Sequence, residues 1–255
     1  MAILQTVTTR LNDAGFIAAD EEAQELLDCA VGDEAVLDAL VERRLSGEPL
    51  AWITGFAMFC GARIKVDRGV FVPRWQSEPL ARRAAWRLPL RGVGIDLCTG
   101  SGAIAKTLFC DRPNSRVVAS DLDQRAVACA ASNGVEVFHG DLFTPLPREL
   151  EGQVDVIVGV VPYVPTRSMA LLPRDTLVFE STLSYDGGED GVEILRRVLE
   201  ESPKFLRSGG FLLLELGGEE ADVLRDDLAR YSFKDITVLS DDDGDVRGIE
   251  ATMGS

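Results

Sequence analysis

Long apolar runs are missing from this chain of 255 residues. No stretch approaches the roughly 18 consecutive apolar residues that a membrane-spanning helix needs. Residues 1–15 contain interspersed polar side chains and no apolar block that ends in small residues, so they do not resemble a secretory signal. We therefore expect a soluble protein that stays in the cytoplasm and does not associate with membranes.

Closely spaced cysteines are also missing. The five cysteines are widely separated, odd in number and never form a C-x-x-C pair. A disulfide framework or a zinc site would need paired or clustered ligands. We therefore expect reduced thiols and no metal site.

Basic residues are scarce. Against 42 aspartates and glutamates the chain has 26 lysines and arginines, which gives a net charge of −16. Such a molecule repels polyanions at long range, and surfaces that bind nucleic acid usually contain clustered Lys and Arg. We therefore expect no nucleic-acid partner. Two interpretations of the acidity stay open: it serves solubility, or it attracts a positively charged substrate.

The hydrophobic pattern changes twice along the chain, which predicts three parts. Residues 1–50 have apolar side chains at helical spacing, with Asp20 and Asp33 as N-cap candidates, so we expect a small helical domain. Residues 51–88 contain short alternating stretches that indicate a linking β-hairpin. Residues 89–255 alternate apolar strands with helical segments, which is typical of a doubly wound, Rossmann-like α/β sheet with helices on both faces.

The expected strands are short apolar runs that are separated by helical stretches. They comprise residues 94–97, 117–120, 136–139, 154–160 and 210–215. A final hairpin is expected over residues 235–252.

A glycine-rich turn follows the first of these strands. It contains Asp96, Gly100 and Gly102, and glycines at such a turn allow a close approach of a ligand to the backbone. The next two strands end in Asp121 and Asp141, and a carboxylate about 20 residues after the turn can bind ribose hydroxyls. The loop lacks the third glycine of a nicotinamide-binding turn, so the spacing favours S-adenosylmethionine over NAD.

Three further blocks give the sequence a specific resemblance. Together with the turn, they resemble the release-factor glutamine methyltransferases of the PrmC/HemK family, in the same order and over most of the chain from residue 45 onward. The blocks are Ser46–Gly55, Val70–Glu78 and Asp186–Gly191. The resemblance implies a class I methyltransferase sheet, S-adenosylmethionine as cofactor and N-methylation as the reaction.

The resemblance also implies a set of site residues. The expected cofactor-binding residues are Asp96, Thr99, Gly100, Gly102, Asp121, Leu122, Asp141, Leu142 and Val160. The expected catalytic residues are Pro162, Tyr163, Glu180, Asp186 and Glu189.

One position departs from the family. Its members carry Asn-Pro-Pro-Tyr after the fourth strand, and the Asn side chain accepts a hydrogen bond from the target amide. This chain reads Val160-Val161-Pro162-Tyr163. Valine has no acceptor atom, so the side-chain half of the amide-binding site is missing.

Three interpretations of this change stay open. The first, which we favour here, is a different nitrogen acceptor: a small guanidino or amino compound such as free arginine, oriented by the carboxylates of Glu180, Asp186 and Glu189. The second is retained methylation of glutamine in a release-factor protein substrate. The third is a protein that binds S-adenosylmethionine without catalysis.

Overall fold

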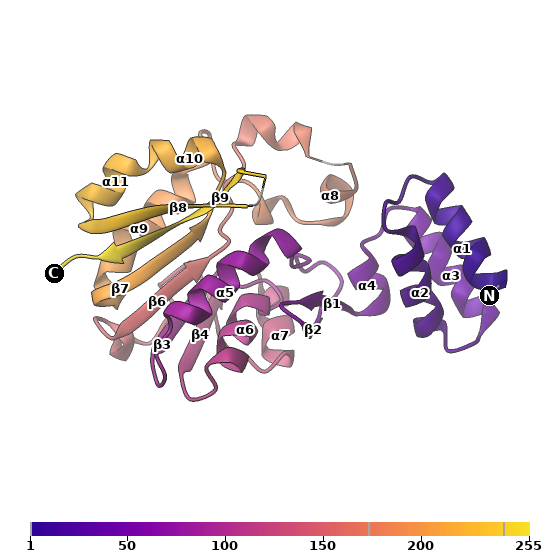
Figure 1. The fold of residues 1–255 in the computed structure, drawn as a ribbon, viewed down its shortest axis with the longest axis horizontal. Coiled ribbons are helices and arrows are strands. Elements are labelled where there is room, and N and C mark those ends of the chain that lie inside the picture. Colours follow the sequence, from indigo (N-terminus) through magenta and orange to yellow (C-terminus); the bar gives the residue numbers. More distant parts are fainter. Residues whose placement is uncertain (1, 173, 242) are drawn as a thin grey trace.

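The N-terminal part of the protein is a bundle of short helices. The computed structural model describes residues 2–172, 174–241 and 243–255. The bundle lies at one end of the molecule (Figure 1) and comprises α1 (Ala2–Asp13), α2 (Ala19–Ala30), α3 (Glu34–Leu45) and the short α4 (Leu50–Thr54). Asp33 caps α3, where its side chain accepts hydrogen bonds from two backbone N–H groups. Leu11, Leu26 and Val41 lie at the centre of its core.

A β-hairpin connects the bundle to the large sheet. Its antiparallel strands are β1 (Phe56–Phe59) and β2 (Ala62–Lys65). Asn133 fastens the hairpin, because its side-chain oxygen accepts from Lys65 N at 2.9 Å and its amide nitrogen donates to Lys65 O at 2.8 Å. The same nitrogen donates to Ser101 O at 2.8 Å, in the glycine-rich turn. The hairpin is therefore tied to that turn.

The large sheet has seven strands in the order β5-β4-β3-β6-β7-β9-β8. The first five of these are parallel neighbours, and β9 runs antiparallel to both β7 and β8. The strands are β3 (Val93–Leu97), β4 (Arg116–Asp121), β5 (Glu136–His139), β6 (Val154–Gly159), β7 (Leu206–Glu215), β8 (Phe233–Ser240) and β9 (Val246–Met253). The predicted fold class, including the helical N-terminal part and the linking hairpin, is confirmed.

Helices cover both faces of the sheet. One face packs against α5 (Glu78–Arg87) and α6 (Ala103–Asp111), and α7 (Gln124–Ser132) lies beside β4 and β5. The other face packs against α9 (Glu193–Phe205), α10 (Gly218–Val223) and α11 (Arg225–Arg230). The remaining helices are α8 (Arg174–Phe179) and the 3-10 turns Trp75–Ser77, Arg148–Leu150, Thr166–Leu171 and Thr182–Ser184.

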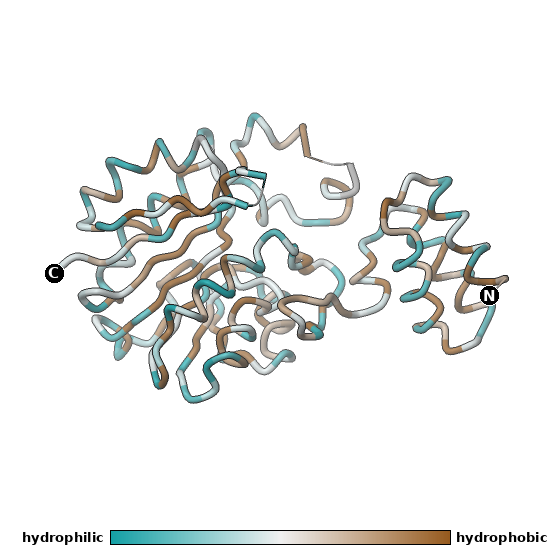
Figure 2. Tube along the Cα trace, viewed as in Figure 1, coloured by the Kyte–Doolittle hydropathy of each residue, from teal (hydrophilic) through white to brown (hydrophobic). Residues whose placement is uncertain are grey.

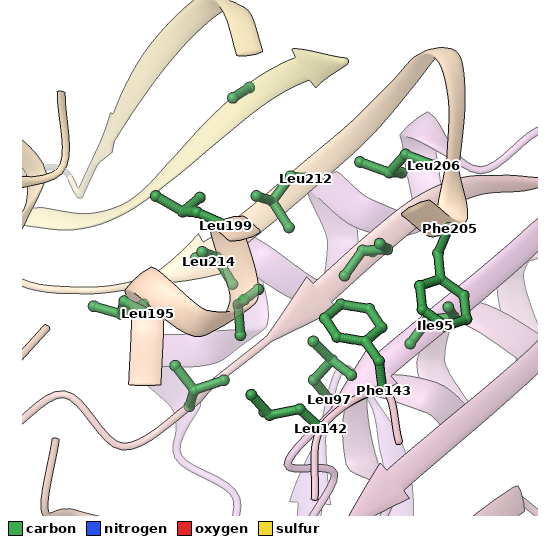
Figure 3. Packing of buried hydrophobic residues seen from close by; sticks show 14 of the residues in the cluster. Ile95, Leu97, Leu142, Phe143, Leu195, Leu199, Phe205, Leu206, Leu212 and Leu214 are labelled. Carbon is green, nitrogen blue, oxygen red and sulfur yellow. The ribbon is translucent and has the colours of Figure 1, made fainter. Parts of the chain in front are cut away.

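The core lies between the sheet and these helices. Figure 2 shows hydrophobic residues concentrated along the central strands. Leu195 and Leu199 of α9 lie against Leu212 and Leu214 of β7 (Figure 3), and all four side chains are fully buried. Successive residues of a strand point to opposite faces, so such strands need apolar side chains at every position.

A buried ion-pair cluster fixes α5 to the sheet. Glu250 of β9 is 2% exposed and accepts hydrogen bonds from both Arg83 and Arg87 of α5.

In the described part of the chain, no helix has the length and hydropathy to cross a membrane. Nor do the described residues include a group of three or more His, Cys, Asp or Glu side chains placed to hold a metal ion.

Candidate cofactor and acceptor site

The candidate site lies at the carboxyl ends of the parallel strands. Strand β3 is flanked by β4 on one side and β6 on the other, so chain connections leave it in both directions. In open α/β sheets ligands bind at this point of divergence. A cavity is found there, and its lining includes the ends of β3, β4 and β6 together with residues 69–74 and 181–186.

The glycine-rich turn is held by Asp96. This carboxylate accepts from Thr99 Oγ1 at 2.6 Å and from Ala105 N at 3.0 Å, which joins the turn to the start of α6. Burial raises the pKa of Asp96 to about 7, although both hydrogen bonds act in the opposite direction. Asp96 and Thr99 also line the cavity.

The two glycines of the turn have different surroundings. Gly100 has φ +58° and lines the cavity, and a Cβ there would meet only Phe71 atoms, at 3.9 Å and beyond. Gly102 has φ +81° and lies outside the cavity lining; a Cβ there would lie 2.9 Å from Val135 and 3.1 Å from Ala130. Gly100 therefore leaves room for a ligand, whereas Gly102 allows the turn to pack beside α7.

Asp121 lies at the end of β4 and faces the same cavity. Its carboxylate accepts from Gly100 N at 2.8 Å and from Asp123 N at 2.9 Å. Burial raises its pKa, and these backbone hydrogen bonds lower it. The neighbouring Ser120 Oγ is buried and has no hydrogen-bond partner among the described residues, although Ser120 lines the cavity. The site therefore has polar atoms that a ribose hydroxyl could satisfy.

The third strand end brings Asp141 and Leu142 to the cavity, and Leu122 lies nearby. Asp141 accepts a hydrogen bond from Arg197 of α9 at 2.7 Å. Sequence reasoning missed Arg197, since it follows Asp141 by 56 positions and belongs to no recognised block. Arg197 therefore fixes the orientation of the Asp141 carboxylate at this edge of the cavity.

In the loop that follows β6, Val160 and Pro162 line the cavity, but Tyr163 does not. Tyr163 packs against the sheet core, and its hydroxyl donates to Glu215 Oε1 at 3.3 Å. Burial, followed by the charge of Glu215, raises the pKa of Tyr163. Tyr163 thus supports the loop from behind.

The three carboxylates expected to bind an acceptor are not equivalent. Glu180 is 6% exposed and accepts from Arg74 at 2.6 Å and from Val72 N at 3.2 Å, while Tyr185 also donates to it. Asp186 lines the cavity and accepts from Thr166 Oγ1 at 2.6 Å. Glu189 is exposed and lies outside the cavity lining.

One part of the cavity wall was not predicted. Residues from the segments 69–74 and 181–186 form part of its wall, and Arg74 of the first segment pairs with Glu180, which immediately precedes the second. Phe71 packs edge-on against Tyr185 with the ring centroids 5.6 Å apart, and the Arg74 guanidinium lies 5.2 Å from the Phe71 centroid. The block Val70–Glu78 resembled the family, but no local pattern identified these side chains as cavity walls.

Comparison with known proteins decides the family. Over 211 residues the chain is 38% identical to the release factor glutamine methyltransferase of Neisseria gonorrhoeae, an alignment that covers 80% of this chain and 76% of the relative. The relative of the same name from Cereibacter sphaeroides is 30% identical and aligns over 98% of this chain and 97% of its own length. The chain belongs to the release factor glutamine methyltransferase family.

Other relatives extend the comparison. The ribosomal protein uL3 glutamine methyltransferase of Burkholderia pseudomallei is 36% identical over 74% of this chain and 67% of its own length. A methyltransferase structure from Pyrococcus furiosus has a TM-score of 0.55 at 20% identity and covers 84% of this chain and 98% of its own, which supports the fold alone. No protein-family model matches the chain.

Family membership confirms the predicted resemblance and the predicted chemistry. The protein is an S-adenosylmethionine-dependent N-methyltransferase. The cavity fits this cofactor, because it combines the open Gly100, the Asp121 carboxylate and the unpartnered Ser120 hydroxyl. The expected cofactor, S-adenosylmethionine, is thereby confirmed over the nicotinamide alternative that the loop spacing disfavoured.

Proposed function

We propose that this enzyme methylates the side-chain nitrogen of a glutamine in a peptide release factor. The observation that carries the proposal is the family, since relatives at 30–38% identity over most of the chain carry the name release factor glutamine methyltransferase. A relative named for ribosomal protein uL3 also acts on glutamine. Glutamine is therefore common to these names, while the protein that presents it differs.

The interpretation that we favoured from the sequence, a free guanidino or amino compound, has no support from these relatives. The carboxylates do not favour it either. Glu180 is already bound by Arg74 and Tyr185, and Glu189 lies outside the cavity lining. Of the three acids, only Asp186 lines the cavity, and one of its oxygens already accepts from Thr166. A guanidinium needs two well-placed carboxylate oxygens for a bidentate contact.

Backbone hydrogen bonds hold the loop that carries Val160, the residue that lacks the side-chain hydrogen-bond acceptor of the family's asparagine. Val164 N donates to Tyr185 O at 2.8 Å, and Gly187 N donates to Val164 O at 2.9 Å. A Cβ on Gly187 would lie 2.7 Å from Tyr163 Cα, so the two segments are in close contact. The backbone beside Pro162 is thus held in place by the segment around Gly187.

Bound S-adenosylmethionine supplies an electrophilic methyl group on a sulfonium. That methyl group would be supplied to the side-chain nitrogen of the target glutamine. The protein's own contribution is positioning and exclusion of water. Asp121 and Gly100, which are hydrogen-bonded to each other, would hold the cofactor, and residues from the segments 69–74 and 181–186 line the cavity and limit the entry of water.

A substrate competition tests the proposal. The purified enzyme is given S-adenosylmethionine with an isotopic methyl label together with three acceptors: a Gly-Gly-Gln release factor, ribosomal protein uL3 and free arginine. We expect label in the release factor, located at the glutamine by mass spectrometry, and none in a release factor with that glutamine replaced by alanine. Labelled arginine without labelled glutamine would refute the proposal, and label in uL3 alone would move it to a different protein substrate.

A further inference from the structure

The short helix α4 packs against two different parts of the molecule. Ile53 belongs to the core of the helical bundle. Trp52, the preceding residue, belongs to a separate apolar cluster, which Val72 and Phe179 join from outside the bundle. Helix α4 therefore links the bundle to the segments around the cofactor cavity.

Trp52 contacts both segments that meet at the cavity wall. Its indole N–H donates to Val70 O at 2.8 Å, in a buried hydrogen bond, and Val70 lines the cofactor cavity. Its ring packs edge-on against Phe179 with the ring centroids 6.3 Å apart. Phe179 directly precedes Glu180, the partner of Arg74. Trp52 therefore holds, from the bundle side, the same two segments that the Arg74–Glu180 ion pair joins.

This wall also borders a second cavity. Its lining includes Val72, Arg74 and Glu180 of the wall. Residues of the bundle line it too, among them Glu25 of α2 and Arg44 of α3. Because Arg74 lines the cofactor cavity as well, a displacement of the bundle would act on a side chain that faces the cofactor site.

We propose that Trp52 is a positioning residue for the cofactor cavity, and that it couples the helical bundle to the binding of S-adenosylmethionine. A buried carbonyl oxygen without a partner costs free energy, so loss of the Trp52 N–H favours wall positions in which Val70 O finds another donor. A ligand that binds only one wall position loses apparent affinity in proportion to the fraction of molecules in the others. Coupling is reciprocal, so the cofactor stabilises the Trp52 contact by the same factor. The inference concerns the cofactor and does not depend on the proposed glutamine substrate.

The first test removes the donor and keeps the aromatic ring. In Trp52→Phe we expect the dissociation constant of S-adenosylmethionine, measured by calorimetry, to rise about five-fold, the usual effect of losing one buried hydrogen bond. Trp52→Leu, which also removes the contact with Phe179, should raise it further. The matched control is Val7→Ala, because Val7 of α1 is buried in the bundle core, a different cluster from that of Trp52. This control should lower the melting temperature and leave the dissociation constant unchanged.

The second test measures the coupling from the bundle side, and its first part needs no variant. In the wild type, saturating S-adenosylmethionine should slow hydrogen exchange of the backbone amides of α4 and leave those of α1 unchanged. In Trp52→Phe the slowing should be lost. A purely structural role for Trp52 would change exchange equally with and without the cofactor.

Three results would overturn the inference. The first is an unchanged dissociation constant in Trp52→Phe. The second is an equal rise in Val7→Ala, because it would trace the effect to the stability of the whole bundle. The third is exchange in α4 of the wild type that does not respond to the cofactor. Each of these results leaves the proposed methylation of glutamine intact.

Discussion

Replacing Glu250 with glutamine should destabilise the fold by an amount that depends on pH. Burial raises the pKa of this carboxyl, but hydrogen bonds and charges from Arg83 and Arg87 outweigh the effect of burial and lower the pKa from 4.5 to about 2. The folded-state pKa therefore lies below the unfolded-state value. The resulting stability is fully present above about pH 4.5 and is lost as the pH falls towards 2.

The magnitude follows from the same numbers. A pKa lowered from 4.5 to about 2 corresponds to about 3.5 kcal/mol, at about 1.4 kcal/mol per pH unit. The side chains of Arg83 and Arg87 are 37% and 25% exposed, so solvent screens part of this attraction. We therefore expect Glu250→Gln, which resembles the protonated acid, to lose about 2–3 kcal/mol at neutral pH.

The assay is urea unfolding of the wild type and of Glu250→Gln at several pH values between 7 and 2.5. Comparing the two proteins at each pH cancels the titration of the other acids. The difference in the free energy of unfolding should be largest at pH 7 and shrink below about pH 4.5. A difference that stays constant with pH, or that is below about 0.5 kcal/mol at pH 7, would refute the ion-pair argument.

Three further predictions concern the site. Asp121→Ala should weaken S-adenosylmethionine binding by about 1.5–3 kcal/mol, the range for hydrogen bonds to a charged group, and unchanged affinity in calorimetry would remove the ribose assignment. Arg74→Ala should loosen the cavity wall, because it leaves the buried Glu180 without its cation; we expect faster hydrogen exchange in residues 69–74 and 181–186, and an unchanged exchange rate would contradict the role of the ion pair. Gly102→Ala should lower the melting temperature, since its Cβ would lie 2.9 Å from Val135, and a melting temperature equal to that of the wild type would contradict the packing argument.

The sequence contained enough information for the fold because the elements have local causes. The central strands β3, β4 and β6 are buried and fall where apolar runs occur, whereas the edge strand β5 is only partly buried and β7 begins earlier than expected, at Leu206. Asp33 caps α3 as predicted, because a carboxylate before a helix can accept from its first N–H groups. Asp20 is not a cap and lies within the first turn of α2, since the helix begins at Ala19. An aspartate near the start of a predicted helix was therefore not enough to tell a capping residue, such as Asp33, from a residue inside the first turn, such as Asp20.

The candidate site was less accessible from the sequence because its main contacts are non-local. Glu180 looked free for a substrate, yet Arg74, 106 positions away, already binds it. Glu215 at the end of β7 likewise accepts a hydrogen bond from Tyr163, 52 positions away. Periodicity and spacing describe neighbours along the chain and cannot identify such partners. The proposed acceptor therefore rests on the relatives.

The amide of Asn133 also places an Asn-Gly pair, the sequence most open to asparagine deamidation, beside the glycine-rich turn. Its nitrogen gives its hydrogens to the carbonyl oxygens of Lys65 and Ser101. The residue that follows is Gly134, the neighbour that least hinders the backbone attack by which asparagine deamidates. Deamidation would replace both donors with a carboxylate that faces two carbonyl oxygens. Hydrogen bonding of Gly134 N to Ala131 O at 3.0 Å restrains the attacking nitrogen, so the chemical lifetime of the cofactor turn depends on the folded end of α7.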